Sequence, residues 1–216
     1  MTQSTTINKQ ETASQTDKRE LILSAASRLF AEKGIPGTSM RSVAQECNVS
    51  AGLIYLYFKD KNELLDAVST EGFRRFHEYL SAVDVSHDPL HGLRALGASY
   101  LRFAQEHPDY YDLMFLDRKP MEADHNQEAW EKGLESHCHL HAHVKACQAA
   151  GCFAGMDSTV LAHTIWSFIH GLASLSVSCR LRMYPEEQRQ QIQQQALDYF
   201  NQMLTHSPQT HEASGN

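Results

Sequence analysis

The amino-acid sequence predicts an all-α protein with about nine helices. Apolar residues recur at spacings of three and four along most of the 216 residues, whereas the alternating pattern of a half-buried strand is rare. Serine, aspartate, proline and glycine stand where such helices would begin and end. Because 42% of the residues are hydrophobic, a chain of this length can bury a substantial core. We expect a small N-terminal head of three helices and a larger helical body.

The first helix of the head is expected to begin at Asp17, which can cap it, and to end near Lys33. Apolar residues spaced three and four apart would form its buried side. Residues 34–37 contain two glycines and a proline and would end it. Residues 1–16 are rich in Thr, Ser and Gln, and this composition predicts a disordered N-terminal tail.

Two short helices joined by a tight turn are expected within residues 39–58. Ser39 would cap the first of them and Ser50 the second. Between them, Asn48 can adopt the left-handed conformation that a tight turn requires. Such a pair predicts a helix-turn-helix, in which the first helix braces the second against the groove of a nucleic acid.

The remaining helices are expected in the body, and the first of them joins the head to it. Their predicted ranges are 61–83, 88–106, 108–116, 124–150, 157–180 and 186–205, and the composition after Ser207 predicts a second disordered tail. The expected organisation is a tail at 1–16, a DNA-binding head at 17–65, a ligand-binding and dimerisation body at 66–206 and a tail at 207–216.

Charge is distributed unevenly between these parts. The formal net charge is -7, from 19 Lys and Arg against 26 Asp and Glu. Through Leu65 the chain has 8 basic against 7 acidic residues, a net of +1, so the remainder has 11 against 19, a net of -8. The acidic total does not exclude a nucleic acid as partner of the head, because phosphate contacts depend on the local field.

The third helix is expected to present an unusual outward surface. On a helical wheel Ile54 and Phe58 point inward, while Gly52, Tyr55 and Leu56 point outward or sideways. These outward residues suit DNA, because glycine permits close approach, leucine can contact thymine methyl groups and tyrosine hydroxyls can reach phosphates.

Two basic side chains flank this surface. Arg41, at the start of the second helix, could reach a base edge or a phosphate. Lys61, at the start of the fourth, could bind a phosphate together with backbone N–H groups. The alternative is a plain helical hairpin with a few exposed apolar residues.

Residues 39–65, SMRSVAQECNVSAGLIYLYFKDKNELL, resemble the DNA-binding head of the TetR family of transcriptional regulators. The residues that carry the resemblance are Ser39, Arg41, Val43, Ala44, Val49, Ser50, Gly52, Tyr55, Phe58, Lys61 and Leu64. Two positions depart from the family pattern: Ala51 stands where a Lys is frequent, and Asn48 where Gly is usual. The departure at Ala51 removes one possible cationic contact with DNA.

The resemblance implies a homodimer that represses transcription and leaves its operator when a small ligand enters the body. It implies DNA contacts at Ser39, Met40, Arg41, Ala51, Gly52, Leu53, Tyr55, Leu56, Tyr57 and Lys61. An activator is the alternative within the family. A helical interaction module that has lost DNA binding is another, although Arg41, Tyr55 and Lys61 argue against it.

The body resembles a subgroup that carries a Trp, His and Gly signature, here Trp166, His170 and Gly171. The helix that holds these residues is apolar on nearly all sides, so one face is expected to line the interior and another to meet a partner subunit. On the helix at 124–150, the predicted inward stripe is Trp130, Leu134, His137, His141 and Val144, with His139 and His143 projecting away.

These stripes predict a pocket with aromatic walls and a few neutral hydrogen-bonding groups. Its expected lining is Tyr111, Trp130, His137, His141, Trp166 and His170. A pocket of this kind suits a small, mostly apolar effector.

The segment HCHLHAHV, residues 137–144, also permits a metal site, because histidines four apart on a helix can bind one ion. His137 and His141, with His163 or His170 as a third ligand, would then serve an all-helical metal-dependent enzyme. The chain lacks an HExxH motif, a carboxylate pair and a nucleophile beside a base. We therefore predict a protein that is not an enzyme and has no metal or cofactor.

The expected location is the cytoplasm. No uninterrupted apolar run approaches the roughly 18 residues of a membrane span, and the N-terminus lacks the apolar segment of a secretory signal. Five cysteines without CxxC spacing predict reduced thiols that are buried as small apolar side chains. The expected partners are an operator in double-stranded DNA, a second copy of the chain and a small-molecule effector, with no membrane.

Overall fold

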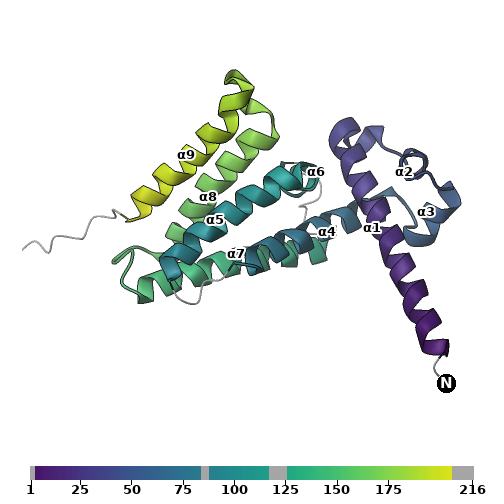
Figure 1. The fold of residues 1–216 in the computed structure, drawn as a ribbon, viewed down its shortest axis with the longest axis horizontal. Helices are drawn as coiled ribbons and strands as arrows, with labels where there is room; N and C mark the ends of the chain where they lie inside the picture. The colour runs from purple at the N-terminus through teal and green to yellow at the C-terminus, as the bar shows by residue number, and fades with distance from the viewer. Residues whose placement is uncertain (1–2, 84–87, 117–125, 206–216) are drawn as a thin grey trace, which may run out of the picture. The chain divides into compact units, whose positions relative to one another are not determined.

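The computed structural model describes residues 3–83, 88–116 and 126–205 (Figure 1). These ranges hold nine α-helices, one π-helical segment and one 3-10 turn, so the all-α prediction is confirmed. The chain divides into two compact units. The first unit comprises the chain up to Phe73 together with Asp109–Trp130, and the second comprises Arg74–Pro108 together with the chain from Glu131 onward. The predicted tail at 207–216 lies outside the described residues.

Helix α1 (Gln3–Gly37) begins earlier than the sequence predicted. The stretch for which composition predicted disorder, from residue 3 to residue 16, is part of this helix rather than a tail before a cap at Asp17. The physical reason is that no proline or glycine interrupts residues 3–33, so the helix continues through the polar residues. The helix is interrupted by a kink at Gly34, whose φ is 71°, directly after the predicted end near Lys33.

The helix-turn-helix forms where the sequence predicted it. Helix α2 (Met40–Glu46) is capped by Ser39 and helix α3 (Ala51–Tyr57) by Ser50. In the turn between them, Asn48 adopts the predicted left-handed conformation with φ of 55°. The backbone N–H of Val49 donates to the carbonyl oxygen of Ala44 at 2.9 Å, which closes the turn. Helices α2 and α3 pack together, and α2 also packs on α1.

The first unit also contains part of helix α4 (Lys61–Ser81), the short helix α6 (Pro108–Tyr111) and the π-helical segment η1 (Asp112–Leu116). The sequence predicted a single helix over residues 108–116. Its second half is π-helical instead, and η1 packs on α1. Gly72 of α4 permits a close approach here, because a Cβ atom at Gly72 would lie 2.6 Å from Sδ of Met114.

The second unit is built from the end of α4 with α5 (Pro89–Glu106), most of α7 (Gln127–Ala149), α8 (Ser158–Val177) and α9 (Glu186–Thr205). Asp88 and Asp157 cap α5 and α8. Helices α5, α8 and α9 lie side by side (Figure 1), and Phe168 of α8 stacks on Phe200 of α9 with ring centroids 4.0 Å apart. The 3-10 turn η3 (Arg180–Met183) between α8 and α9 was not predicted.

Among the described residues, α8 is the one helix that is long and apolar enough to cross a membrane by length and composition. The core helix of a protein without a membrane passes the same test. Ile165 and Ile169 of α8 are buried, and the helix packs against α5, which is the arrangement of a core helix.

The prediction that all cysteines are buried is wrong in part. Cys47 and Cys147 are buried, whereas Cys138 and Cys179 are exposed, and all are free thiols. Cys138 lies within α7, and Cys179 lies between α8 and η3.

Candidate DNA interface and ligand site

Helix α3 places apolar side chains on both its inner and its outer side. Ile54 and Phe58 are buried in the core of the first unit, as the helical wheel predicted. Leu56 is 81% exposed and Tyr55 is 55% exposed. Burying an apolar side chain is favourable, so an outward leucine on a short, well-capped helix needs an external partner to gain that free energy.

Gly52 lies on the same exposed part of α3 and has no neighbour that would exclude a side chain. A Cβ atom built there would meet only Oγ of Ser50, at 3.9 Å. Glycine within a helix costs roughly 0.5–1 kcal/mol relative to alanine. The packing of the head therefore does not explain Gly52, whereas close approach to a partner surface does.

The start of α2 is held in place by a reciprocal capping box. Oγ of Ser39 accepts from the N–H of Ser42 at 3.1 Å, and Oγ of Ser42 accepts from the N–H of Ser39 at 3.0 Å. Ser39 and Arg41 are exposed at this end of the helix and remain candidate DNA contacts. Met40 is only 7% exposed, because its side chain points into the core of the head. We therefore leave Met40 out of the candidate interface.

Lys61 is oriented differently from the sequence expectation. Its Nζ donates to the carbonyl oxygen of Ile35 at 2.8 Å and to that of Thr38 at 3.2 Å. Ile35 belongs to the last residues of α1, after the kink at Gly34, and Thr38 lies between α1 and α2. The Lys61 side chain is half-buried, and its two hydrogen bonds stabilise the head. A DNA phosphate that bound Lys61 would therefore interact with an ammonium group that already donates to two carbonyl oxygens.

In the second unit, three imidazole rings surround the Trp166 side chain. Its ring centroid lies 5.8 Å from that of His137, 5.7 Å from that of His163 and 5.9 Å from that of His170. His137 and Trp166 come from α7 and α8, so two helices bring predicted pocket residues together. An indole with imidazoles at its edges offers an apolar face with a few polar groups beside it.

His170 is held by a tyrosine that the sequence reasoning missed. The ring nitrogen Nδ1 of His170 lies 3.0 Å from the hydroxyl of Tyr100, a buried residue of α5. The other nitrogen, Nε2, lies 3.3 Å from the hydroxyl of Ser174. Burial lowers the pKa of His170, so the ring is neutral at neutral pH. The sequence did contain a signal for this contact, because a tyrosine stands within the apolar stripe of the helix predicted at 88–106, and a buried tyrosine hydroxyl usually has a hydrogen-bond partner.

The predicted pocket residues do not all fall in one unit. His137, His141, Trp166 and His170 belong to the second unit, whereas Tyr111 and Trp130 belong to the first. Tyr111 is buried in the core of the first unit. His141 contacts α8, because its Nε2 lies 2.9 Å from the hydroxyl of Ser158.

The inward stripe predicted for α7 is wrong at Trp130 and Leu134 but right at Val144, which is fully buried. Trp130 is 44% exposed and Leu134 is exposed as well, whereas His143, which was expected to project away, is only 8% exposed. The buried positions of α7 are Ala129, Ser136, His143, Val144 and Cys147. This stripe contains small and polar residues, and so the larger apolar residues on the opposite side dominated the sequence pattern.

Among the side chains that the structure describes, no group of three His, Cys, Asp or Glu residues is arranged to hold a metal ion. His137 and His141, the pair suggested by the sequence, instead contact Trp166 and Ser158.

Two family models match the chain. The model described as "Bacterial regulatory proteins, tetR family" matches residues 22–68, which include α2 and α3. The model described as "Tetracyclin repressor-like, C-terminal domain" matches residues 93–200. The resemblance of residues 39–65 is thereby confirmed, and the comparison extends it to most of the body.

Individual transcriptional regulators are also similar to this chain in sequence. A helix-turn-helix-type transcriptional regulator of Haemophilus influenzae is 32% identical over 147 residues, which are 68% of this chain and 76% of that protein. The regulator HbdR of Aromatoleum sp. is 25% identical over 158 residues, 73% of this chain and 69% of that protein.

One similar solved structure is AibR in complex with isovaleryl coenzyme A and operator DNA. The TM-score is 0.69 and the sequence identity is 19%, and the match covers 86% of this chain and 96% of the AibR chain. At this identity the likeness shows the fold alone. Together with the exposed recognition helix, these findings establish what the protein is: the chain belongs to the TetR family and is a DNA-binding transcriptional regulator with a ligand-binding body, not an enzyme.

Proposed function

We propose that the protein is a homodimeric repressor that binds a near-palindromic operator and leaves it when a small, mostly apolar effector enters the second unit. The proposed DNA contacts are Ser39, Arg41, Ala51, Gly52, Leu53, Tyr55, Leu56, Tyr57 and Lys61. A two-fold dimer would place its two recognition helices in successive major grooves, about 34–36 Å apart. We also propose that it acts in the cytoplasm, because its proposed partner is DNA.

The observation that carries the DNA-binding proposal is the outer surface of α3. Gly52 has open space around it and Leu56 is almost fully exposed, so neither residue serves the packing of the head. Both suit the floor of a major groove, where a helix must approach closely and where thymine methyl groups offer apolar contact.

Apolar side chains on the outer faces of α8 and α9 support the dimer. Val160 and Leu175 of α8 and Tyr199 and Met203 of α9 are all exposed in the single chain. A two-fold dimer buries the same patch on both subunits, so one exposed patch suffices for a self-complementary interface.

The environment of Trp166 supports an effector that is mostly apolar. His137, His170 and Trp166 combine flat apolar surface with a few hydrogen-bonding groups, as ligand sites generally do. The isovaleryl coenzyme A in the AibR complex makes an acyl-chain compound a reasonable first class to test.

Selection of binding sites from random DNA duplexes tests the core of this proposal. We expect the purified protein to enrich a near-palindrome with two equal half-sites. The Gly52→Ala variant should be as stable as the wild type or more stable, yet should bind the selected site at least tenfold more weakly. Enrichment of asymmetric or unrelated sequences would refute sequence-specific binding by a two-fold dimer. Unchanged affinity of Gly52→Ala would refute the role given to the outer surface of α3.

A further inference from the structure

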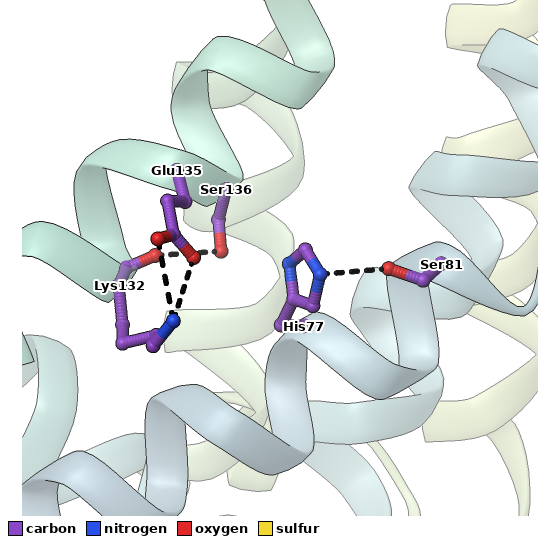
Figure 2. A network of polar contacts seen from close by, with 5 residues as sticks. All are labelled: His77, Ser81, Lys132, Glu135 and Ser136. Carbon is purple, nitrogen blue, oxygen red and sulfur yellow. Dashed lines mark hydrogen bonds and ion pairs between the residues drawn. The ribbon is translucent and has the colours of Figure 1, made fainter.

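Three histidines form a second polar cluster in the second unit, apart from the rings around Trp166. His77 lies on α4, and His139 and His143 lie one turn apart on α7. The ring centroids of His77 and His139 are 6.4 Å apart, and those of His139 and His143 are 4.4 Å apart. In Figure 2 the His77 ring extends from α4 toward the part of α7 that carries Ser136. Sequence reasoning had placed His139 and His143 on the outside.

Two ring nitrogens of this cluster are buried and have no hydrogen-bond partner among the described residues. They are Nδ1 of His77 and Nε2 of His139. The other nitrogen of His77, Nε2, lies 3.0 Å from the hydroxyl of Ser81 (Figure 2). Buried polar atoms are nearly always paired, so each of these two nitrogens has capacity for a hydrogen bond that the described residues do not use.

The hydrogen bonds of the cluster determine where a proton can be accepted. Nδ1 of His143 lies 2.8 Å from the carbonyl oxygen of His139, and because a carbonyl only accepts, Nδ1 must carry the proton. The Nε2 atom of a neutral His143 therefore has a free lone pair. Burial, followed by the nearby His143 and His77 rings, lowers the pKa of His139. Without a bound anion His139 is therefore neutral at neutral pH, and an anion beside it would favour uptake of a proton.

No carboxylate is among the charged groups that act on His139. The groups that act on His139 are the other two histidines. On the same two helices, Arg74 forms an ion pair with Glu78, and Lys132 forms one with Glu135 at 3.0 Å (Figure 2). The charged residues nearest to the cluster along the chain are Arg75 and Glu78 on α4 and Lys145 on α7. At His139 a ligand with an ammonium group would thus meet no opposite charge, whereas an anion would be paired once the cluster gains a proton.

We infer that His77, His139 and His143 anchor the carboxylate group of the effector, with proton uptake on binding. This inference rests on the proposed function, because it assigns the polar end of the same effector whose apolar part would lie elsewhere in the second unit. The two carboxylate oxygens accept from Nδ1–H of His77 and Nε2–H of His139. The proton taken from solvent converts one of the three imidazoles to the cation, and no other bond is made or broken.

Titration calorimetry with octanoate and the full-length protein tests this inference. Octanoate should bind about tenfold more tightly near pH 6 than near pH 8, because its affinity rises as pH falls through the histidine pKa that the anion has raised. The heat should vary with the ionisation enthalpy of the buffer in the direction of proton uptake. Octanamide, which has no charge, should show neither effect.

Variants of the three histidines test whether the pH dependence of octanoate binding arises at this cluster. His139→Gln and His77→Gln should each lose most of the pH dependence and about tenfold in octanoate affinity near pH 6. His91→Gln is the matched control, since His91 is an exposed residue of α5 in the same unit and should leave both unchanged. If the cluster variants fail to fold, NMR of the imidazole nitrogens in the wild type replaces them, and octanoate should raise the pKa of His139.

Several outcomes would overturn the inference. In calorimetry, these are an absence of octanoate binding at both pH values, an octanoate affinity that does not depend on pH, or a full pH effect in His139→Gln. In NMR, the contradicting result is a His139 pKa that octanoate leaves unchanged, as expected if only water occupies the cluster. Release of the operator by uncharged compounds with the cluster uninvolved would leave the proposed function intact while refuting the anchor. Failure to find any operator would instead refute the proposed function.

Discussion

The ammonium group of Lys61 donates a 2.8 Å hydrogen bond to the carbonyl oxygen of Ile35, 26 residues earlier in the chain. A second hydrogen bond, to the carbonyl oxygen of Thr38, measures 3.2 Å. A single cation at the start of α4 thus fixes the segment that joins α1 to α2. The orientation of the helix-turn-helix within the first unit depends in part on this side chain.

Replacing Lys61 by Met should lower the free energy of unfolding by roughly 1–2 kcal/mol, because two carbonyl oxygens lose a charged donor. Binding to all duplexes should weaken to a similar extent, since the residue contacts no base. Urea denaturation and duplex titration measure the two effects. Lys59→Met is the control, because the Lys59 side chain is exposed, and it should keep wild-type stability. Wild-type stability of Lys61→Met would show that the two bonds contribute nothing.

Leu56 and Arg41 should affect DNA binding in different ways. Leu56→Ala removes an exposed side chain that we assign to base edges, so it should relax preference at particular operator positions by roughly 1–3 kcal/mol. Arg41→Ala should reduce the slope of affinity against salt concentration by about one ion if Arg41 contacts a phosphate. Titrations of the selected site and of its single-base variants at several salt concentrations separate the two. An equal loss on every sequence for Leu56→Ala would contradict its assignment.

Gly72 should tolerate no side chain, because of the close approach of Met114. In Gly72→Ala the new Cβ would lie 2.6 Å from Sδ and 3.0 Å from Cγ of a fully buried methionine. We expect destabilisation of about 1–3 kcal/mol from overpacking. Gly171→Ala, in α8 with nothing within 4 Å of the new Cβ, should instead stabilise the protein by roughly 0.5–1 kcal/mol. Thermal unfolding of both variants provides the comparison, and equal behaviour of the two would be inconsistent with the observed packing.

The stability of the protein should decline as the solution becomes mildly acidic. Burial lowers the pKa of His107, His139 and His170 from the usual value of 6.5. The unfolded chain takes up protons at these residues near pH 6.5, whereas the folded protein takes them up only at lower pH. Their contribution to stability is therefore complete above about pH 6.5 and is lost as pH falls from there toward the folded pKa values.

Urea midpoints near pH 7.5 and near pH 5.5 measure this decline. His170→Gln removes one of the three groups and should show a smaller difference between the two midpoints. A midpoint that rises on acidification over this range would contradict the direction of the pKa shifts.

Trp166 should determine how strongly an effector acts. Hydrophobic and aromatic compounds can be screened for thermal stabilisation and for release of the operator. A ligand shifts the protein away from DNA only by its differential affinity for the conformation that does not bind DNA, so losing a contact with Trp166 should weaken release. We expect Trp166→Ala to require at least tenfold more compound. Release at undiminished potency from a folded Trp166→Ala dimer would place the pocket elsewhere in the body.

The sequence by itself determined the helix-turn-helix almost residue by residue. Its caps Ser39 and Ser50 and the left-handed Asn48 all occur as predicted, because capping and turn geometry depend on the residue itself and its nearest neighbours. The inward and outward sides of α3 were also predictable, since a short helix with two large apolar residues on one side has a single way to pack.

Only the tertiary structure decided which side of α7 is buried and what Lys61 binds. A helix that carries histidines around much of its circumference has no dominant apolar stripe, so its rotation is set by the elements that cover it. The hydrogen bond from Tyr100 to His170 joins residues 70 apart in the chain, and the contact of His77 with His139 joins α4 to α7. Local sequence carries no information about such distant pairs, because they form only when helices from separate parts of the chain pack together.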